Sequence, residues 1–154
     1  MPEKIKYSSC DIPAKSSKKT INRNRVCLFR DDFTWTGVGI DEYKHTSAGK
    51  DWADIARQVL VGQRGESTKF HLRYFEIKPG GYSSYETHKH EHVVIGIRGK
   101  GKARLNRRNI VIKFLDVVYI KPDTPHRLYN PYDEPFGFFC IVDARRDRPM
   151  SVNK

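Results

Sequence analysis

Three histidines and two glutamates fall within seven residues of the chain, in the segment ETHKHEH at positions 86–92. Only three further histidines occur among the 154 residues, so the concentration of imidazole groups at this point is unusual for the chain. Imidazole and carboxylate groups together bind borderline and hard divalent metal ions. The segment therefore predicts a metal site, and its spacing indicates which of its side chains are ligands.

The segment reads as the end of one β-strand, a short turn and the start of another strand. Side chains alternate between the two faces of a strand, so Glu86 and His88 share a face. His92 opens the apolar run HVVIGIRG, and a turn at 89–91 lets all three side chains face the same interior. His90 falls in the turn, where we expect it to be exposed near the mouth of the site.

The stretch resembles the first conserved motif of the cupin superfamily, G(x)5HxH(x)3-4E(x)6G. Counting from Gly80 to Gly99 needs no gap, and it places Glu86, His88 and His92 at the three ligand positions. The residue types are permuted, because Glu86 stands at the position of the first family histidine and His92 at that of the usual glutamate. The resemblance thus implies these three ligands in preference to the more visible pair of histidines two residues apart.

The second cupin motif, G(x)5PxG(x)2H(x)3N, is matched in spacing by LDVVYIKPDTPHRLYN at 115–130, which supplies His126 and Asn130. Leu115, Lys121 and Asp123 replace the glycine, proline and glycine of that motif. The implied ligand set is Glu86, His88, His92 and His126.

The implied site holds one divalent transition metal per chain, which is Fe, Mn, Ni, Cu, Co or Zn. One or two coordination positions stay open for water or substrate, as in catalytic rather than structural sites. Glu86 either stays bound or detaches to act as a catalytic base. One alternative remains open: Glu86 accepts a hydrogen bond from a ligand histidine, and His90 turns inward as the ligand in its place.

The last apolar strand, FGFFCIVDA at 136–144, has Phe138 and Cys140 in the parity that faces the interior. Tyr82 and Ser84 share the parity of Glu86, so we expect these four residues to line the pocket. The interior is expected to be apolar and aromatic with few cations, which favours a small organic substrate over a phosphate. Cys140 is read first as a small buried hydrophobe, and otherwise as an oxidisable thiol beside the metal.

Short strands with turn signals every 8–12 residues indicate an all-β sandwich or barrel. The resemblance implies the cupin double-stranded β-helix, a jelly-roll barrel, with short helical turns. We expect a basic arm at 1–25 and one cupin domain at 26–154, with the barrel at about 66–145. The expected strands are 33–44 (an edge strand), 57–62, 70–77, 82–88, 92–99, 102–106, 110–114, 116–120, 126–130 and 136–144, with a helical turn between 47 and 60.

The net charge is +11, of which residues 1–25 contribute +5, so the excess of positive charge is spread over the chain. Its basic segments are not interleaved with aromatic residues, and we consider nucleic acid an unlikely partner. No apolar stretch is long enough to cross a bilayer and no secretory signal is visible, so we expect a cytoplasmic protein without a membrane partner. The resemblance implies a homodimer that uses residues 26–65.

Three functions fit the predicted site. The first is an oxidoreductase of the dioxygenase type that acts on a small chelating organic substrate. The second is an isomerase, lyase or cyclase that uses the metal as a Lewis acid. The third is a non-catalytic binding or sensor module, for which the basic arm is the only argument.

Overall fold

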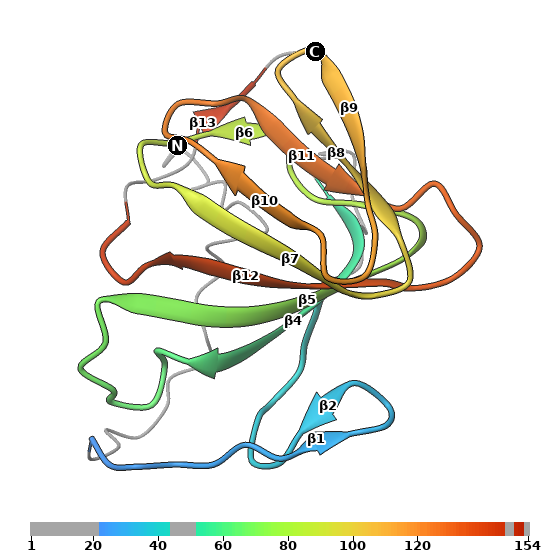
Figure 1. The fold of residues 1–154 in the computed structure, drawn as a ribbon. Helices are drawn as coiled ribbons and strands as arrows, with labels where there is room; N and C mark the ends of the chain where they lie inside the picture. Colours follow the sequence, from blue (N-terminus) through green and yellow to red (C-terminus); the bar gives the residue numbers. More distant parts are fainter. Residues whose placement is uncertain (1–21, 44–51, 147–149, 153–154) are drawn as a thin grey trace, which may run out of the picture.

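The protein is an all-β barrel in the computed structural model, which describes residues 22–43, 52–146 and 150–152. One layer contains β3 (Asp41–Tyr43), β4 (Ala53–Val61), β5 (Phe70–Tyr82), β12 (Phe136–Asp143), β7 (His92–Arg98) and β10 (Val117–Ile120), in that order. The other contains β9 (Arg108–Ile112), β8 (Gly101–Leu105), β11 (His126–Tyr129), β6 (Glu86–Thr87) and β13 (Met150–Ser151). Figure 1 shows the two layers facing each other.

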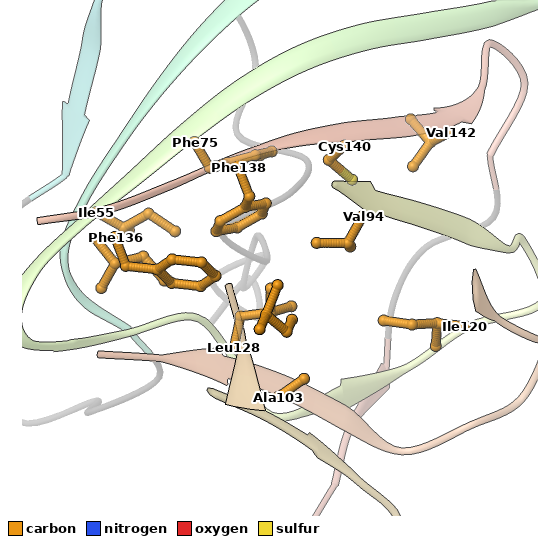
Figure 2. Packing of buried hydrophobic residues seen from close by; sticks show 12 residues of the cluster. Ile55, Phe75, Val94, Ala103, Ile120, Leu128, Phe136, Phe138, Cys140 and Val142 are labelled. Carbon is orange, nitrogen blue, oxygen red and sulfur yellow. The ribbon is translucent and has the colours of Figure 1, made fainter. Parts of the chain in front are cut away.

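The barrel core forms because alternate residues of the long strands are apolar and point inward. On β12 these are Phe136, Phe138, Cys140 and Val142, all at most 3% exposed. Figure 2 shows Phe138, Cys140 and Val142 projecting from one strand toward Val94. The antiparallel register places Phe138 opposite Phe75 of β5 and Cys140 opposite Val94 of β7. The core therefore consists of successive layers of side chains along the barrel axis.

A second, smaller core lies on the outer face of the barrel. The hairpin of β1 (Phe29–Arg30) and β2 (Thr34–Trp35) packs there, with Trp35 at 5.0 Å from Tyr74 and 5.8 Å from Phe139 between ring centroids. The expected single edge strand at 33–44 is instead interrupted, because Phe33 and Gly37 adopt φ of 57° and 71°. Val26, Leu28, Phe29 and Ile40 stay exposed, and all four lie in the segment for which a homodimer contact stays a prediction.

Two further expectations about secondary structure differ from the structure. No residue that the structure describes is helical, and Ala53–Val61 is a strand in place of a helical turn, because Ile55 and Val59 alternate into the core. Residues 44–51, the other part of that expectation, lie outside the described residues. The same holds for 1–21 of the basic arm. The expected strand 82–88 is broken at 83–85, and β5 instead continues through the predicted turn at 78–81.

The second motif keeps its turn geometry although its glycines are absent. Leu115 and Asp123 adopt φ of 65° and 61°, the left-handed conformation that the motif glycines favour. Asn130 is 1% exposed, and its Nδ2 donates to the carbonyls of Ile77 at 2.9 Å and Glu134 at 2.7 Å. The asparagine of the motif therefore fastens β5 to the turn after β11. No helix among the described residues is long and apolar enough to cross a membrane.

Candidate metal centre

Three histidines converge at one end of the barrel. His88 follows β6, His92 is the first residue of β7, and His126 is the first residue of β11. The register brings these points together, because His126 lies opposite Glu86 of β6 and His92 lies opposite Val142 of β12. One ring nitrogen from each of the three lies within 4.8 Å of those of the other two, and all three side chains are buried. We call this group the histidine triad.

The outer nitrogen of each triad ring has a partner that fixes the direction of the ring. His88 Nδ1 donates to the carbonyl oxygen of His90 at 2.7 Å, and His126 Nδ1 donates to that of Thr124 at 2.8 Å. His92 Nδ1 lies 3.2 Å from Sγ of Cys140. A ring that donates through Nδ1 presents a lone pair at Nε2, which is how ligand histidines are commonly oriented.

The convergence of Nε2 atoms fits a cation. His88 Nε2, which carries a lone pair, lies 2.7 Å from His92 Nε2. Two nitrogens bound to one metal at roughly 2.1 Å lie about 3.4 Å apart in tetrahedral geometry, so the rings of His88 and His92 would separate by less than about 1 Å to accommodate an ion. Burial holds the pKa of His92 well below its usual value, and burial likewise lowers that of His126. His92 and His126 are therefore neutral near pH 7, the state in which imidazole binds metal.

Glu86 lies beside the triad. Its side chain is buried, and Oε1 is 3.9 Å from His88 Nε2. Its main chain is fixed by pairing with His126 on one side and Ser151 on the other. The carboxylate is not one of the three groups that lie within mutual ligand distance. Its role as the fourth ligand stays a prediction.

His90 is not the exposed turn residue that the strand pattern suggested. It is 5% exposed, and its ring is stacked on that of His88 with centroids 3.5 Å apart and planes at 2°. The turn at 89–91 folds back because the Nδ1 of His88 bonds the main chain of His90, which draws the second ring over the first. His90 thus packs against a triad ring, and its centroid lies 5.2 Å from that of His92.

A small interior cavity adjoins the triad and encloses about 20 Å³, which is room for roughly one water. Glu86, His92, His126, Phe138 and Cys140 are among the residues that line it. Its remaining lining consists of Ile55, Phe75, Ser83, Val94 and Leu128.

The expectation that Tyr82 and Ser84 line this pocket is wrong. The break in the strand at 83–85 shifts the alternation by one residue, so that Ser83 faces the cavity and binds Leu128 N through Oγ at 3.0 Å. Tyr82 lies in a surface groove on the outer face, with the guanidinium of Arg127 at 4.9 Å from its ring. Ser84 is buried but does not line the cavity.

The expectation of few interior cations is also wrong. Arg57 and Arg73 are 2% and 1% exposed, and both lie on the inward parity of their strands. Nη2 of Arg73 donates to Sγ of Cys140 at 3.4 Å. The alternation in FHLRYFEI already carried this information, because Arg73 is two residues from the inward Phe75.

Comparisons with known proteins agree with this geometry. The family model described as "Cupin domain" matches residues 73–142. The chain is 36% identical over 122 residues to the 1-methylthio-D-xylulose 5-phosphate methylsulfurylase of Rhodospirillum rubrum. The aligned residues cover 79% of this chain and 76% of that protein.

Two solved structures are similar in both sequence and fold. A cupin 2 conserved barrel domain protein from Rhodopseudomonas palustris is 32% identical with a TM-score of 0.77, over 84% of this chain and 87% of that one. A cupin-2 domain protein from Rhodospirillum rubrum is 33% identical with a TM-score of 0.71, over 90% of this chain and 84% of that one. The two sequence motifs, the barrel and these relatives together place the chain in the cupin family, as a type-2 single-domain cupin.

Proposed function

We propose that the protein is a metal-dependent enzyme that transfers a methylsulfanyl group from a 1-methylthio ketose phosphate to a thiol. The observation that carries this proposal is the thiol of Cys140, which lines the same cavity as Glu86 and His126 and contacts the ring of His92. The methylsulfurylase relative, at 36% identity, supports sulfur chemistry at such a site.

The histidine triad would hold one divalent ion, with Glu86 as the fourth ligand. Such an ion supplies Lewis acidity, which polarises the carbonyl group of a ketose next to the carbon that carries sulfur. Three neutral imidazoles and one carboxylate suit Fe, Mn, Ni, Cu, Co or Zn. The buried Nδ1 partners of His88 and His126 keep the rings in place during turnover.

Cys140 receives the methylsulfanyl group in this scheme. Its thiolate attacks the thioether sulfur, an S–S bond forms, and the C1–S bond breaks with its electron pair passing to C1 and the neighbouring carbonyl. Glu86, which is buried beside the cavity, first takes the thiol proton of Cys140 and then delivers that proton to C1. A small-molecule thiol removes the methylsulfanyl group from Cys140 by thiol–disulfide exchange, which restores the enzyme.

The test uses metal-loaded protein, 1-methylthio-D-xylulose 5-phosphate and a small thiol, with the mixed methyl disulfide measured by mass spectrometry. Cys140→Ser should abolish product while bound metal stays unchanged. Cys27→Ser is the matched control, because Cys27 is a free cysteine that packs in the outer core, and it should retain full turnover. Unchanged turnover in Cys140→Ser would refute the proposed role of the thiol.

An oxidoreductase of the dioxygenase type is the second proposal, with Glu86 as base. Its support is the ligand set, since imidazole ligands also suit redox-active Fe and Cu. Oxygen consumption separates the two proposals: the sulfur transfer proceeds without O₂, whereas a dioxygenase stops when O₂ is removed. An isomerase or lyase that shares the Lewis-acid chemistry would instead turn over without any added thiol.

A further inference from the structure

Two buried arginines occupy the barrel wall beside the candidate metal centre. Arg73 of β5 lies opposite Cys140 of β12, one inward step from the level at which Val142 meets His92. Arg57 of β4 lies opposite Phe75 of β5. An inward step along a strand is about 6.7 Å. The two arginines, which we call the arginine pair, are thus at the levels of the interior cavity lined by Phe75 and Cys140.

Full burial of two guanidinium groups is costly in the absence of compensating negative charge. Arg57 is paired with Asp41 at 3.2 Å. The side chain of Arg57 is buried, whereas that of Asp41 is 36% exposed, so the ion pair lies at the boundary between the interior and the solvent. Arg73 contacts Sγ of Cys140 and lies 5.0 Å from the ring of Phe75. The guanidinium group of Arg73 therefore lies against two residues that line the cavity, whereas that of Arg57 lies against Asp41.

The charge of the loaded site favours an anion. Asp41 pairs with Arg57, and Glu86 lines the interior cavity. A divalent ion held by the histidine triad would add two positive charges to this part of the barrel. Arginine binds phosphate through two parallel hydrogen bonds, and it is retained in buried positions where such recognition is needed.

We propose that Arg57 and Arg73 form an anion subsite that holds the phosphate of a sugar-phosphate substrate while the opposite end of that substrate reaches the candidate metal centre. This inference rests on the proposed function for the identity of the substrate, but the subsite itself follows from the arginine pair. The cavity encloses only about 20 Å³, so a sugar phosphate would enter only if the lining side chains moved apart.

The test measures the affinity of the metal-loaded protein for D-xylulose 5-phosphate and for D-xylulose by calorimetry. Arg73→Met and Arg57→Met should each weaken binding of the phosphate ester by roughly 30-fold and leave binding of the free sugar unchanged. Arg98→Met is the matched control, because Arg98 is a half-buried arginine of the same sheet whose partner is Glu76 on the outer face. It should change neither affinity.

The unmodified protein gives a second readout in case a variant fails to fold. The Nε–Hε NMR signals of Arg57 and Arg73, assigned with Arg→Lys variants, should shift when inorganic phosphate is added, whereas the signal of Arg98 should not. Static signals of the pair, or unchanged affinity for the phosphate ester in both Met variants, would overturn the subsite. Phosphate binding at the pair without sulfur transfer would instead refute the proposed function and leave the subsite standing.

Discussion

Asn130 provides a sharp test of how the second motif stabilises the barrel. Its side chain is buried and makes three hydrogen bonds: Nδ2 donates to the carbonyls of Ile77 and Glu134, and Oδ1 accepts from Tyr132 N at 3.0 Å. Asn130→Ala removes all three and leaves the carbonyl of Ile77 without this donor in the barrel interior.

The expected loss of stability follows from these bonds. Each contributes roughly 1 kcal/mol net, so the free energy of unfolding should fall by about 3 kcal/mol. For a chain of this size, that loss lowers the unfolding midpoint by roughly 6–12 °C. Urea unfolding followed by tryptophan fluorescence measures the first quantity, and calorimetry measures the second.

Asn109→Ala is the matched control, because its Oδ1 accepts one exposed hydrogen bond from Tyr129 at 3.2 Å. It should change stability by less than about 0.5 kcal/mol. A loss below about 1 kcal/mol in Asn130→Ala would show that the motif asparagine does not fasten β5 to the turn.

Four further predictions concern strain, packing, pH and assembly. Leu115→Gly should raise stability by roughly 1 kcal/mol in thermal unfolding, because an exposed leucine with φ of 65° is strained and glycine is not. Gly96→Ala should cost more than about 2 kcal/mol, since a Cβ there would lie 2.1 Å from the carbonyl oxygen of Lys113. Burial, followed by the charge of nearby arginines, lowers the pKa of His71 from 6.5 to about 4. The unfolded chain therefore binds more protons than the folded one between these pH values. The free energy of unfolding should be highest above pH 6.5 and should fall by about 1 kcal/mol toward pH 4, after allowance for solvent screening. His71→Gln should reduce this pH dependence in urea titrations. Native mass spectrometry should find a homodimer, and a clean monomer would contradict the contact expected at 26–65.

Much of the barrel could be predicted because strand alternation and turn residues are local properties of the chain. The strands at 92–98 and 136–143 lie within the expected ranges, since their apolar residues alternate without interruption. The convergence of His88, His92 and His126 was likewise predictable from the spacing of the two motifs. The pairing of β6 with β11 holds His126 opposite Glu86, and His92 at the start of β7 completes the group.

The positions of the other residues near the histidine triad depend on tertiary contacts, which the alternation of residues along a strand does not encode. The main-chain bond between Ser83 and Leu128 breaks the strand, which turns Tyr82 outward and Ser83 inward. The stacking of His90 on His88 follows from a single side-chain bond to a carbonyl. The alternation in FHLRYFEI predicts that Arg73 points inward with Phe75, but we expected an apolar interior with few cations.

The most direct test is the metal content of protein purified without a metal-affinity column, measured by elemental mass spectrometry on the unmodified chain and on four variants. The account predicts about one divalent transition metal per chain. It also predicts loss of that metal in His88→Ala and His126→Ala, weakened binding in Glu86→Ala and retention in His90→Ala. Absence of metal in the unmodified chain, even after reconstitution with Mn, Fe, Ni, Cu, Co and Zn, would contradict the claim that the histidine triad is a metal centre.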